Sequence, residues 1–395
     1  MPYFCPKKRE TLNTETFLAT FLPQINGTDR FLFFAPGRIN LMGDHTDYTE
    51  GLVLPAALSV GTYLFVKLIP EQEIQFHSLN YNEKITLPFD LLSVPQKKWT
   101  DYPAGILVEM EQKGWQKQGL ELTFFSDVPL NAGLSSSAAI ETVTAFAIQQ
   151  IFSIELSKKE LVLLAQRAEH HFAGVQCGIM DQYTAVFGKP GKALLLDCHE
   201  INHKETDASF TGYDFVAVNT NVKHSLVQSV YNQRVEELNR VKEIINSFFD
   251  VPYLGMLRGE DHEWLDKLVE DTTLKNRLRH VVNENTRVEV AAELLEQQNA
   301  RAFGELMYAS HDSLAFDFEV SCEELDFLVQ AASQIEGTAG ARMTGAGFGG
   351  CTLNLVKHEA VSGFSEEIKT KYKEETGKEA SVYLLSLSGK MKSFS

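Results

Sequence analysis

Cysteine is scarce and scattered in this sequence. The five cysteines are odd in number and show neither CxxC nor any other paired spacing typical of metal ligands: Cys5, Cys177, Cys198, Cys322 and Cys351. A disulfide framework or a zinc site is therefore not expected. No apolar run approaches the roughly 20 residues of a membrane-spanning helix, and the N-terminus lacks an apolar signal segment. We expect a cytoplasmic protein that does not enter a membrane.

Positive charge is also in short supply. Lysine and arginine together number 36 against 53 acidic residues, which gives a formal net charge of −17. Such a field repels the phosphate backbone of nucleic acids and anionic membrane surfaces, so neither is expected as a partner. A small phosphate ligand is still allowed, because a few backbone amides and one or two cations are enough to bind it.

Repeats, low-complexity tracts and a Pro/Gly/Ser-rich linker are all missing. At 395 residues the chain is long enough for two domains. Short apolar runs alternate with helical patterns from about residue 30 to 205, and the alternation continues more loosely to the end. We therefore expect an α+β fold with two domains, 1–205 and 206–395, although no linker marks this boundary.

Local signals predict individual elements. Ser157 and Glu160 have capping-box spacing, and Leu156 and Leu161 flank them as a hydrophobic staple, which predicts a helix from here to near Gly174. Strands are predicted over 30–37, 62–69, 120–127, 192–198, 213–220, 350–356 and 381–388. Further helices are predicted over 231–249, 286–310, 322–335 and 359–376. The charged segment 251–280 has weak periodicity and receives no functional interpretation.

The most informative segment is DVPLNAGLSSSAAIETVTAFAIQQIF, residues 127–152. A strand ends near Pro129, a loop of small residues follows, and a helix begins near Ser136. First-turn amides of a helix have no internal partners and bind phosphate oxygens, and serine hydroxyls are suited to phosphate or magnesium. The P-loop sequence GxxxxGK[ST] is absent from the chain. Three serines alone would favour a simpler alternative, an N-capped helix after a flexible turn.

Two other segments combine glycine with polar residues. APGRINLMGDHTDYTEGLVLPAAL, residues 35–58, places Asp44, His45 and Asp47 between apolar stretches, and buried polar groups at this density usually bind a ligand or one another. A hydrogen-bonded turn would explain any one of them singly. GARMTGAGFGGCTLNLV, residues 340–356, has five glycines before or at the start of an apolar strand. Glycine lets backbone amides approach a ligand, although tight strand connections need it too.

In this order and at this spacing, the three segments resemble the three motifs of the GHMP small-molecule kinases, and among these the galactokinases. GRINLMGDHTDYTEGLVLP is similar to the sugar motif, GLSSSAA to the phosphate loop and GARMTGAGFGG to the third motif, while CGIMDQY and SVYNQR also fit. The similarity runs from about residue 30 to the end of the chain. It implies a GHMP-kinase-like two-domain architecture with mixed sheets and an active site in the interdomain cleft.

The resemblance also implies an activity. This is the transfer of the ATP γ-phosphoryl group to the anomeric hydroxyl of α-D-galactose, with Mg²⁺ as cofactor, which feeds the Leloir pathway of galactose metabolism. The expected partners are small molecules, and the family favours a monomer. By resemblance, Asp181 is the general base, and Arg38 orients it and stabilises developing negative charge. Such a carboxylate beside a guanidinium stays ionised near neutral pH.

Binding residues follow from the same resemblance. The sugar would contact Asp44, His45, Asp47, Asp181 and Tyr231. ATP would contact the loop residues Gly133, Leu134, Ser135, Ser136, Ser137 and Ala138, with Trp99 and Tyr102 at the adenine. Magnesium would be held by Ser137 and Glu169. A place in the core is the alternative for Trp99, and a solvated helix end is the alternative for Glu169.

The chain departs from the family pattern at three places. Asp44 stands where the sugar motif usually has glutamate, so the carboxylate that meets the distal hydroxyl is one methylene shorter. Asn131 replaces a frequent glycine, and Ala315-Phe316 replaces the usual Arg-Asp. The shorter Asp44 leaves open a kinase for another sugar, such as an N-acetylated hexosamine, a uronic acid or arabinose.

A third possibility belongs to a different class of protein. Some relatives of these kinases are non-catalytic sugar sensors, which resemble the enzymes but lose residues of the phosphate loop. Here GLSSSAA is complete, and Arg38 and Asp181 are both present. The sequence therefore favours an enzyme over a sensor.

Overall fold

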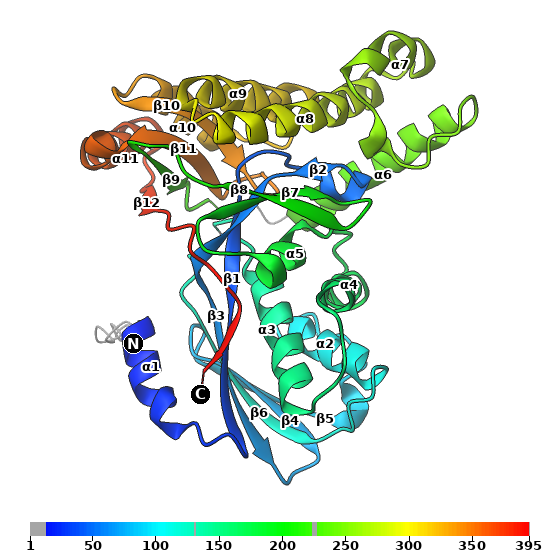
Figure 1. Cartoon of the computed structure of the whole chain (residues 1–395), viewed down its shortest axis with the longest axis vertical. Helices are drawn as coiled ribbons and strands as arrows, with labels where there is room; N and C mark the ends of the chain where they lie inside the picture. Colours follow the sequence, from blue (N-terminus) through cyan, green and yellow to red (C-terminus); the bar gives the residue numbers. More distant parts are fainter. Residues whose placement is uncertain (1–12, 130–131, 223–226, 395) are drawn as a thin grey trace, which may run out of the picture.

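Two β-sheets organise the chain in this computed structural model, which describes residues 13–129, 132–222 and 227–394 (Figure 1). Within these residues the first sheet has nine strands, with the order β13-β1-β3-β6-β4-β5 and with β2, β7 and β8 attached beside β3. Its strands are β1 (Arg30–Asn40), β2 (Leu52–Val53), β3 (Pro55–Ile69), β4 (Glu73–Ser78), β5 (Glu83–Pro88), β6 (Gly119–Ser126), β7 (Lys192–Asp197), β8 (Asn202–Asp207) and β13 (Lys392–Phe394). The β4–β6 pair is parallel and the other pairs are antiparallel, so this sheet is mixed.

Helices cover both faces of the first sheet. On one face lie α2 (Asp101–Glu111), α3 (Ser136–Ile151), α4 (Lys158–Ala168) and α5 (Met180–Phe187), and α1 (Thr14–Phe21) lies on the other (Figure 1). The α2–α5 face buries a large aliphatic core with Leu64, Val143 and Leu164 fully enclosed. The α1 face is aromatic, with Phe17 stacked on Phe125 at 5.1 Å between ring centroids. Burying such side chains is the main stabilising contribution to this half.

The second sheet is antiparallel and has the order β10-β11-β9-β12. Its strands are β9 (Tyr213–Asn219), β10 (Thr338–Thr344), β11 (Cys351–Lys357) and β12 (Ser381–Leu384). The helices of this half are α6 (Val227–Asn246), α7 (His262–Leu268), α8 (Thr272–Glu296), α9 (Ala300–Asp312), α10 (Glu323–Ser333) and α11 (Val361–Thr376). One hydrophobic cluster joins the two halves, because Ile39 and Leu54 of the first pack with Phe215, Phe303 and Leu353 of the second.

Most of the predicted elements are confirmed, with ends shifted by a few residues. The helix α3 begins at Ser136 as expected, and the capping box of Ser157 and Glu160 is present at the start of α4. After Ala168 the chain continues as a π-helical turn over Glu169–Ala173, which ends at Gly174 with φ 72°. Such π turns occur often at functional sites.

The prediction of one helix over 286–310 is wrong. The structure has two helices here, since α8 starts already at Thr272 and ends at Glu296, and α9 begins at Ala300. Gln298 has a φ of 56°, which a continuous helix does not allow. The side chain of Asn299 then caps α9 by accepting from Ala302 N.

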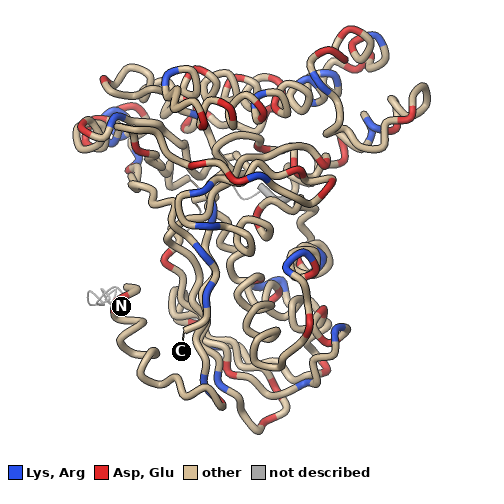
Figure 2. The backbone as a smooth tube through the Cα atoms, viewed as in Figure 1, with Lys and Arg blue, Asp and Glu red and all other residues tan. Residues whose placement is uncertain are grey.

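Other expectations concern the whole chain. The expected boundary at residue 205 falls inside β8, and the C-terminal strand β13 returns to the first sheet, where it pairs with β1. The four cysteines within the described residues form no disulfide, and Cys5 lies outside them. In the described part of the chain, no helix has the length and apolarity to cross a membrane. Basic residues are spread over both halves among acidic ones (Figure 2).

Candidate active site

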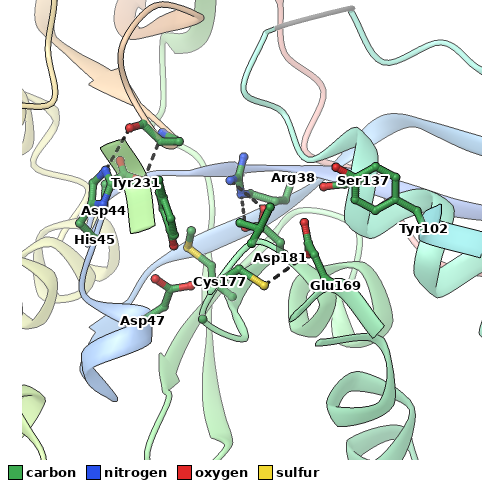
Figure 3. Close-up of a pocket in the computed structure, with 15 residues that line it drawn as sticks. Arg38, Asp44, His45, Asp47, Tyr102, Ser137, Glu169, Cys177, Asp181 and Tyr231 are labelled. Carbon is green, nitrogen blue, oxygen red and sulfur yellow. Dashed lines mark hydrogen bonds and ion pairs between the residues drawn. The ribbon is translucent and has the colours of Figure 1, made fainter. Parts of the chain in front are cut away.

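A cavity of about 320 Å³ lies where the two halves meet. The sugar motif, the segment around CGIMDQY and the phosphate loop supply most of its wall, while α6 and the third glycine-rich loop contribute from the second half. The labelled side chains in Figure 3 all line it: Arg38, Asp44, His45, Asp47, Tyr102, Ser137, Glu169, Cys177, Asp181 and Tyr231. Residues that lie up to 308 positions apart in sequence, such as Arg38 and Ala346 (346 − 38), thus share one cavity.

Asp181 and Arg38 form a two-point ion pair. Arg38 Nε and Nη2 donate to Oδ1 and Oδ2 of Asp181 at 2.8 and 3.0 Å (Figure 3). Arg38 is buried with 6% of its side chain exposed, whereas 27% of the Asp181 side chain is exposed. Asp181 also stands in the first turn of α5, where the helix dipole favours a negative charge. The carboxylate is therefore held in a fixed orientation and remains reachable from the cavity.

The phosphate loop contacts this ion pair directly. Ser135 Oγ donates to Asp181 Oδ2, and Arg38 Nη1 donates to the carbonyl oxygen of Gly133. Gly133 and Ser135 both have left-handed backbones, with φ of 67° and 58°. Leu134 accepts from Arg38 N at 3.2 Å, so the loop is attached to β1 by backbone as well as by side chain.

The start of α3 lacks a side-chain cap. Ser135 occupies the N-cap position of α3 but makes no capping hydrogen bond, because its hydroxyl contacts Asp181 instead. The simpler alternative of an N-capped helix is therefore not what the structure has. Ser136, Ser137 and Ala138 form the first turn, whose amides have no intrahelical acceptor. A phosphate group is a suitable acceptor for such amides.

Two buried glutamates and one glutamine lie next to Ser137. Gln182 Nε2 donates to Glu169 Oε2 at 2.6 Å and to Glu141 Oε2 at 3.1 Å. Cys177 Sγ lies 3.3 Å from the same Glu169 oxygen, and Ser137 and Glu169 both line the cavity. Burial, followed by the nearby charge of Asp181, raises the pKa of Glu169 to about 7. Burial and the Glu169 charge likewise raise the pKa of Glu141 well above its ordinary value.

This group of residues fits a magnesium ion. Oε1 of Glu141 is buried and has no hydrogen-bond partner among the described residues, so one polar oxygen of this group is left uncompensated. The described residues include no cluster of three or more His, Cys, Asp or Glu side chains arranged for a metal. Mg²⁺ does not need one, because it commonly takes one or two protein ligands and completes its shell with phosphate oxygens and water.

The two carboxyl groups of the sugar motif, Asp44 and Asp47, are both buried but have different neighbours. Asp44 is 1% exposed and ion-paired with Arg342, and its Oδ1 accepts from Asn40 Nδ2 at 3.1 Å and from Gly345 N at 3.2 Å. Burial raises its pKa, and Arg342 partly offsets this effect. Asp47 is also buried, and burial together with the charge of Asp181 raises its pKa to about 7.

His45 is neutral and bonded on both sides. Burial lowers its pKa to about 3, so the ring carries a single N–H at neutral pH. Nε2 lies 3.2 Å from the carbonyl oxygen of Ala346, which requires an N–H there, and Nδ1 then accepts from Tyr48 OH at 2.9 Å. The ring also contacts Tyr231, with 5.5 Å between centroids. His45 therefore links the sugar motif to the third glycine-rich loop.

The two predicted adenine contacts are placed differently. Tyr102, on α2, lines the cavity. Trp99 is not among the residues that line it: its Nε1 donates to Glu83 Oε2 at 2.8 Å, and its ring meets Phe76 and Phe124 edge to face at 6.3 and 5.7 Å. Trp99 is partly buried and packs against the core of the first sheet, and its contact with adenine stays a prediction.

Of the departures from the family pattern that fall within the described residues, Asp44 lines the cavity and Ala315-Phe316 lies apart from it. Ala315 and Phe316 belong to a π-helical turn over Ser313–Asp317, and Phe316 is 74% exposed. Neither lines the cavity. Asn131 lies outside the described residues.

Sequence reasoning missed several residues of the site. Glu141 and Arg342 were not singled out, although a glutamate within the apolar run that follows GLSSSAA and an arginine between glycines were available signals. Cys177 and Gln182 were seen only as members of CGIMDQY. None of these positions reveals its partner from sequence, because Arg342 and Asp44 are separated by 298 residues.

Three family models match the chain. These are the galactokinase galactose-binding signature at residues 19–68, the GHMP kinase N-terminal domain at 101–189 and the GHMP kinase C-terminal domain at 291–374. The chain is 39% identical to a galactokinase of Clostridium beijerinckii over 90% of this chain and 93% of that protein. It is 40% identical to a galactokinase of Bacillus subtilis over 89% of this chain and 91% of that protein.

Solved structures agree with this match. The crystal structure of Lactococcus lactis galactokinase complexed with galactose has a TM-score of 0.90 at 36% identity, covering 96% of this chain and 98% of that one. Methanococcus jannaschii mevalonate kinase has a TM-score of 0.64 at 19% identity over 90% of this chain and 97% of that one, so it shares the fold. The fold is thus that of a GHMP kinase. At this identity and coverage, the chain belongs to the galactokinase family.

Proposed function

We propose that this chain transfers the γ-phosphoryl group of ATP to the anomeric hydroxyl of α-D-galactose, giving galactose 1-phosphate and ADP. The observation that carries the proposal is the contact between Asp181 and the phosphate loop. Ser135 of the loop donates to Asp181, and Arg38, the ion-pair partner of Asp181, donates to the carbonyl oxygen of Gly133. A carboxylate suited to take a proton from a hydroxyl lies beside a helix start suited to bind a phosphate. Phosphoryl transfer needs this juxtaposition more than it needs covalent help.

In the proposed mechanism Asp181 accepts the proton of the attacking sugar hydroxyl as the new P–O bond forms. Arg38 fixes the direction of the carboxylate through the two-point contact. The first-turn amides of α3 bind the oxygens of the terminal phosphate and stabilise charge that builds up on them. Ser137 and Glu169 would hold Mg²⁺, which neutralises phosphate charge when bound.

The sugar and the nucleotide would occupy different parts of the cavity. Asp44, His45, Asp47 and Tyr231 are proposed as the sugar side, where carboxylates accept hydrogen bonds from sugar hydroxyls. Tyr102 and Trp99 are proposed as the adenine contacts; Tyr102 lines the cavity, whereas Trp99 packs partly buried against the core of the first sheet. The shorter Asp44 keeps a different sugar as the alternative substrate.

The test is an ADP-release assay with Mg·ATP across a panel of free sugars: galactose, glucose, N-acetylgalactosamine, galacturonic acid and arabinose. Mevalonate and a reaction without acceptor are the controls, because the fold is shared with mevalonate kinases. We expect galactose to give the highest kcat/KM, and phosphorus NMR to locate the new ester at C1. Turnover confined to another sugar would contradict galactose as the substrate, and galactose binding without ADP release would indicate a sensor.

Three further properties stay predictions. These are the division into domains 1–205 and 206–395, a monomeric state and a cytoplasmic location. Support for the division comes from the change of sheet between β8 and β9. Sedimentation of the purified chain would test the monomer.

A further inference from the structure

Helix α8 reaches the backbone of the sugar motif at three points. His280 Nε2 lies 3.0 Å from the carbonyl oxygen of Asp44, and Glu284 Oε1 accepts from Gly43 N at 3.0 Å. Further along the motif, Asn285 Oδ1 accepts from Leu52 N at 2.8 Å. His280, Glu284 and Asn285 are all completely buried. One helix of the second half thus satisfies backbone groups near both ends of the segment 43–52 of the first half.

This segment has an unusual backbone that depends on outside partners. Gly43 has a φ of 96° and His45 one of 66°, so the chain turns sharply where the sugar motif enters the cavity. A buried N–H or carbonyl group without a partner costs free energy, and a sharply turned loop offers few internal partners. The contacts from α8 provide them.

Close packing leaves little room for adjustment. A Cβ at Gly43 would come within 2.7 Å of Val288 Cγ2, and one at Gly51 would come within 2.4 Å of Asn285 Oδ1. The backbone of the segment therefore lies directly against α8 at both glycines. A shift of the helix would be passed on to the loop, because packed interiors do not deform easily.

Two of the three side chains, Glu284 and His280, are themselves anchored by further hydrogen bonds. Glu284 Oε1 also accepts from Ser310 Oγ at 2.7 Å, and its Oε2 accepts from Arg287 Nε at 2.6 Å. These partners and Arg342 outweigh the effect of burial and lower the pKa of Glu284 to about 2, so it is a carboxylate at neutral pH. His280 Nδ1 lies 2.9 Å from Ser313 Oγ.

We propose that His280, Glu284 and Asn285 are positioning residues for the sugar, which hold segment 43–52 so that Asp44, His45 and Asp47 face the cavity. The inference rests on the proposed function, since it concerns the same sugar site. The hydrogen bonds described for the three side chains end on the sugar motif, Ser310, Ser313 and Arg287, and none reaches the described phosphate-loop residues 132–138. Loss of these hydrogen bonds should therefore weaken sugar binding more than ATP binding.

A matched pair of variants on α8 tests the proposal. Asn285→Ala removes the bond to Leu52 N, whereas Asn283→Ala removes a side-chain bond of similar length, 2.8 Å to His262, from the same helix without touching the sugar motif. We expect Asn285→Ala to raise the KM for galactose roughly tenfold and the KM for ATP less than about twofold, as the loss of one buried hydrogen bond would. Asn283→Ala should change neither KM.

A second pair keeps the test valid if one variant is unstable. His280→Leu removes the donor to Asp44 O, while His280→Gln retains an N–H at a similar reach and should restore most of the galactose affinity. Circular dichroism establishes folding, and calorimetry measures galactose binding without turnover. An unchanged galactose KM in folded Asn285→Ala and His280→Leu, or equal rises in both KM values, would overturn the positioning role. Absence of wild-type turnover with galactose would instead contradict the proposed function.

Discussion

Replacing Asp181 by asparagine removes the proposed base while keeping its size and shape. The amide oxygen can still accept from Arg38 Nε, which lies 2.8 Å from Oδ1 in the native protein. The amide NH₂ faces Arg38 Nη2 and Ser135 Oγ, which both donate to Oδ2 at present. Arg38 thereby loses its charge partner in a place where only 6% of its side chain is exposed. We expect a loss of unfolding free energy on the order of 1–2 kcal/mol, reduced by the partial exposure of position 181.

The effect on turnover should be much larger. General-base catalysis typically contributes about 10²–10⁴-fold, which corresponds to roughly 3–5 kcal/mol of activation free energy. An asparagine cannot accept the proton, so kcat should fall by this amount. The neighbouring carboxyl group of Asp47 would respond as well. The charge of Asp181 contributes, after burial, to raising the pKa of Asp47 to about 7, so the variant should have a lower Asp47 pKa.

The assay combines ADP release at saturating galactose and Mg·ATP with calorimetry of galactose binding. We expect kcat to fall at least about a hundredfold while galactose binding persists. Asp197→Asn is the matched control, because Asp197 accepts hydrogen bonds from His199 N and Glu200 N, outside the cavity. Its kcat should match the wild type. A folded Asp181→Asn variant that keeps more than about one tenth of the wild-type kcat would refute the assignment of the base.

Three further predictions concern the same cavity. The KM for galactose should fall as the pH rises from about 6 to about 8, because Asp47, whose pKa is raised to about 7, loses its proton over this range and can then accept hydrogen bonds from sugar hydroxyls. The variant Asp47→Asn should flatten this pH profile. Asp44→Ala should raise the KM for galactose more than that for 6-deoxygalactose, and equal rises would argue against contact with the distal hydroxyl. Glu169→Gln should raise the Mg²⁺ concentration for half-maximal rate roughly tenfold and weaken Mn²⁺ binding measured by paramagnetic resonance, with an unchanged galactose KM; an unaltered metal requirement would remove Glu169 from the metal site.

Local signals predicted the parts of the site that depend on neighbouring residues. The start of α3 at Ser136 follows from a strand, a small-residue loop and an apolar helical face in succession. The capping box of Ser157 and Glu160 fixes the start of the helix that leads to Glu169. Three-residue and four-residue spacings carry these signals, so a single sequence is enough to read them.

Long-range contacts were not predictable in this way. The pairing of Arg342 with Asp44 and of α8 with the sugar motif joins residues more than 200 positions apart. Segment 251–280 seemed uninformative because its apolar residues follow no single period. In the structure Val251, Leu254 and Val269 are buried in one cluster with residues of α6 and α8. Irregular loops and short helices bury such residues without a repeating pattern.

The surroundings of Trp99 could not be predicted from the sequence either, although its contacts lie nearer to it in the chain. Tryptophan is large and amphipathic, so sequence alone allows it in a core or at a ligand. Its partner Glu83 and its neighbours Phe76 and Phe124 come from three different strands of the first sheet. Only the pairing of those strands decides that the indole packs, partly buried, against them.

The distribution of charge in the cavity explains how a strongly acidic chain accommodates a nucleotide. The proposed sugar side is lined by Asp44, Asp47 and Asp181, which suit the many hydroxyl donors of a neutral sugar. The proposed phosphate side relies on backbone amides at the start of α3, which carry no net charge to balance. The guanidinium groups of Arg38 and Arg342 are already paired with Asp181 and Asp44. A sugar that brings its own carboxylate would meet these acids without a free cation among the described lining residues, so the arrangement favours a neutral hexose over a uronic acid.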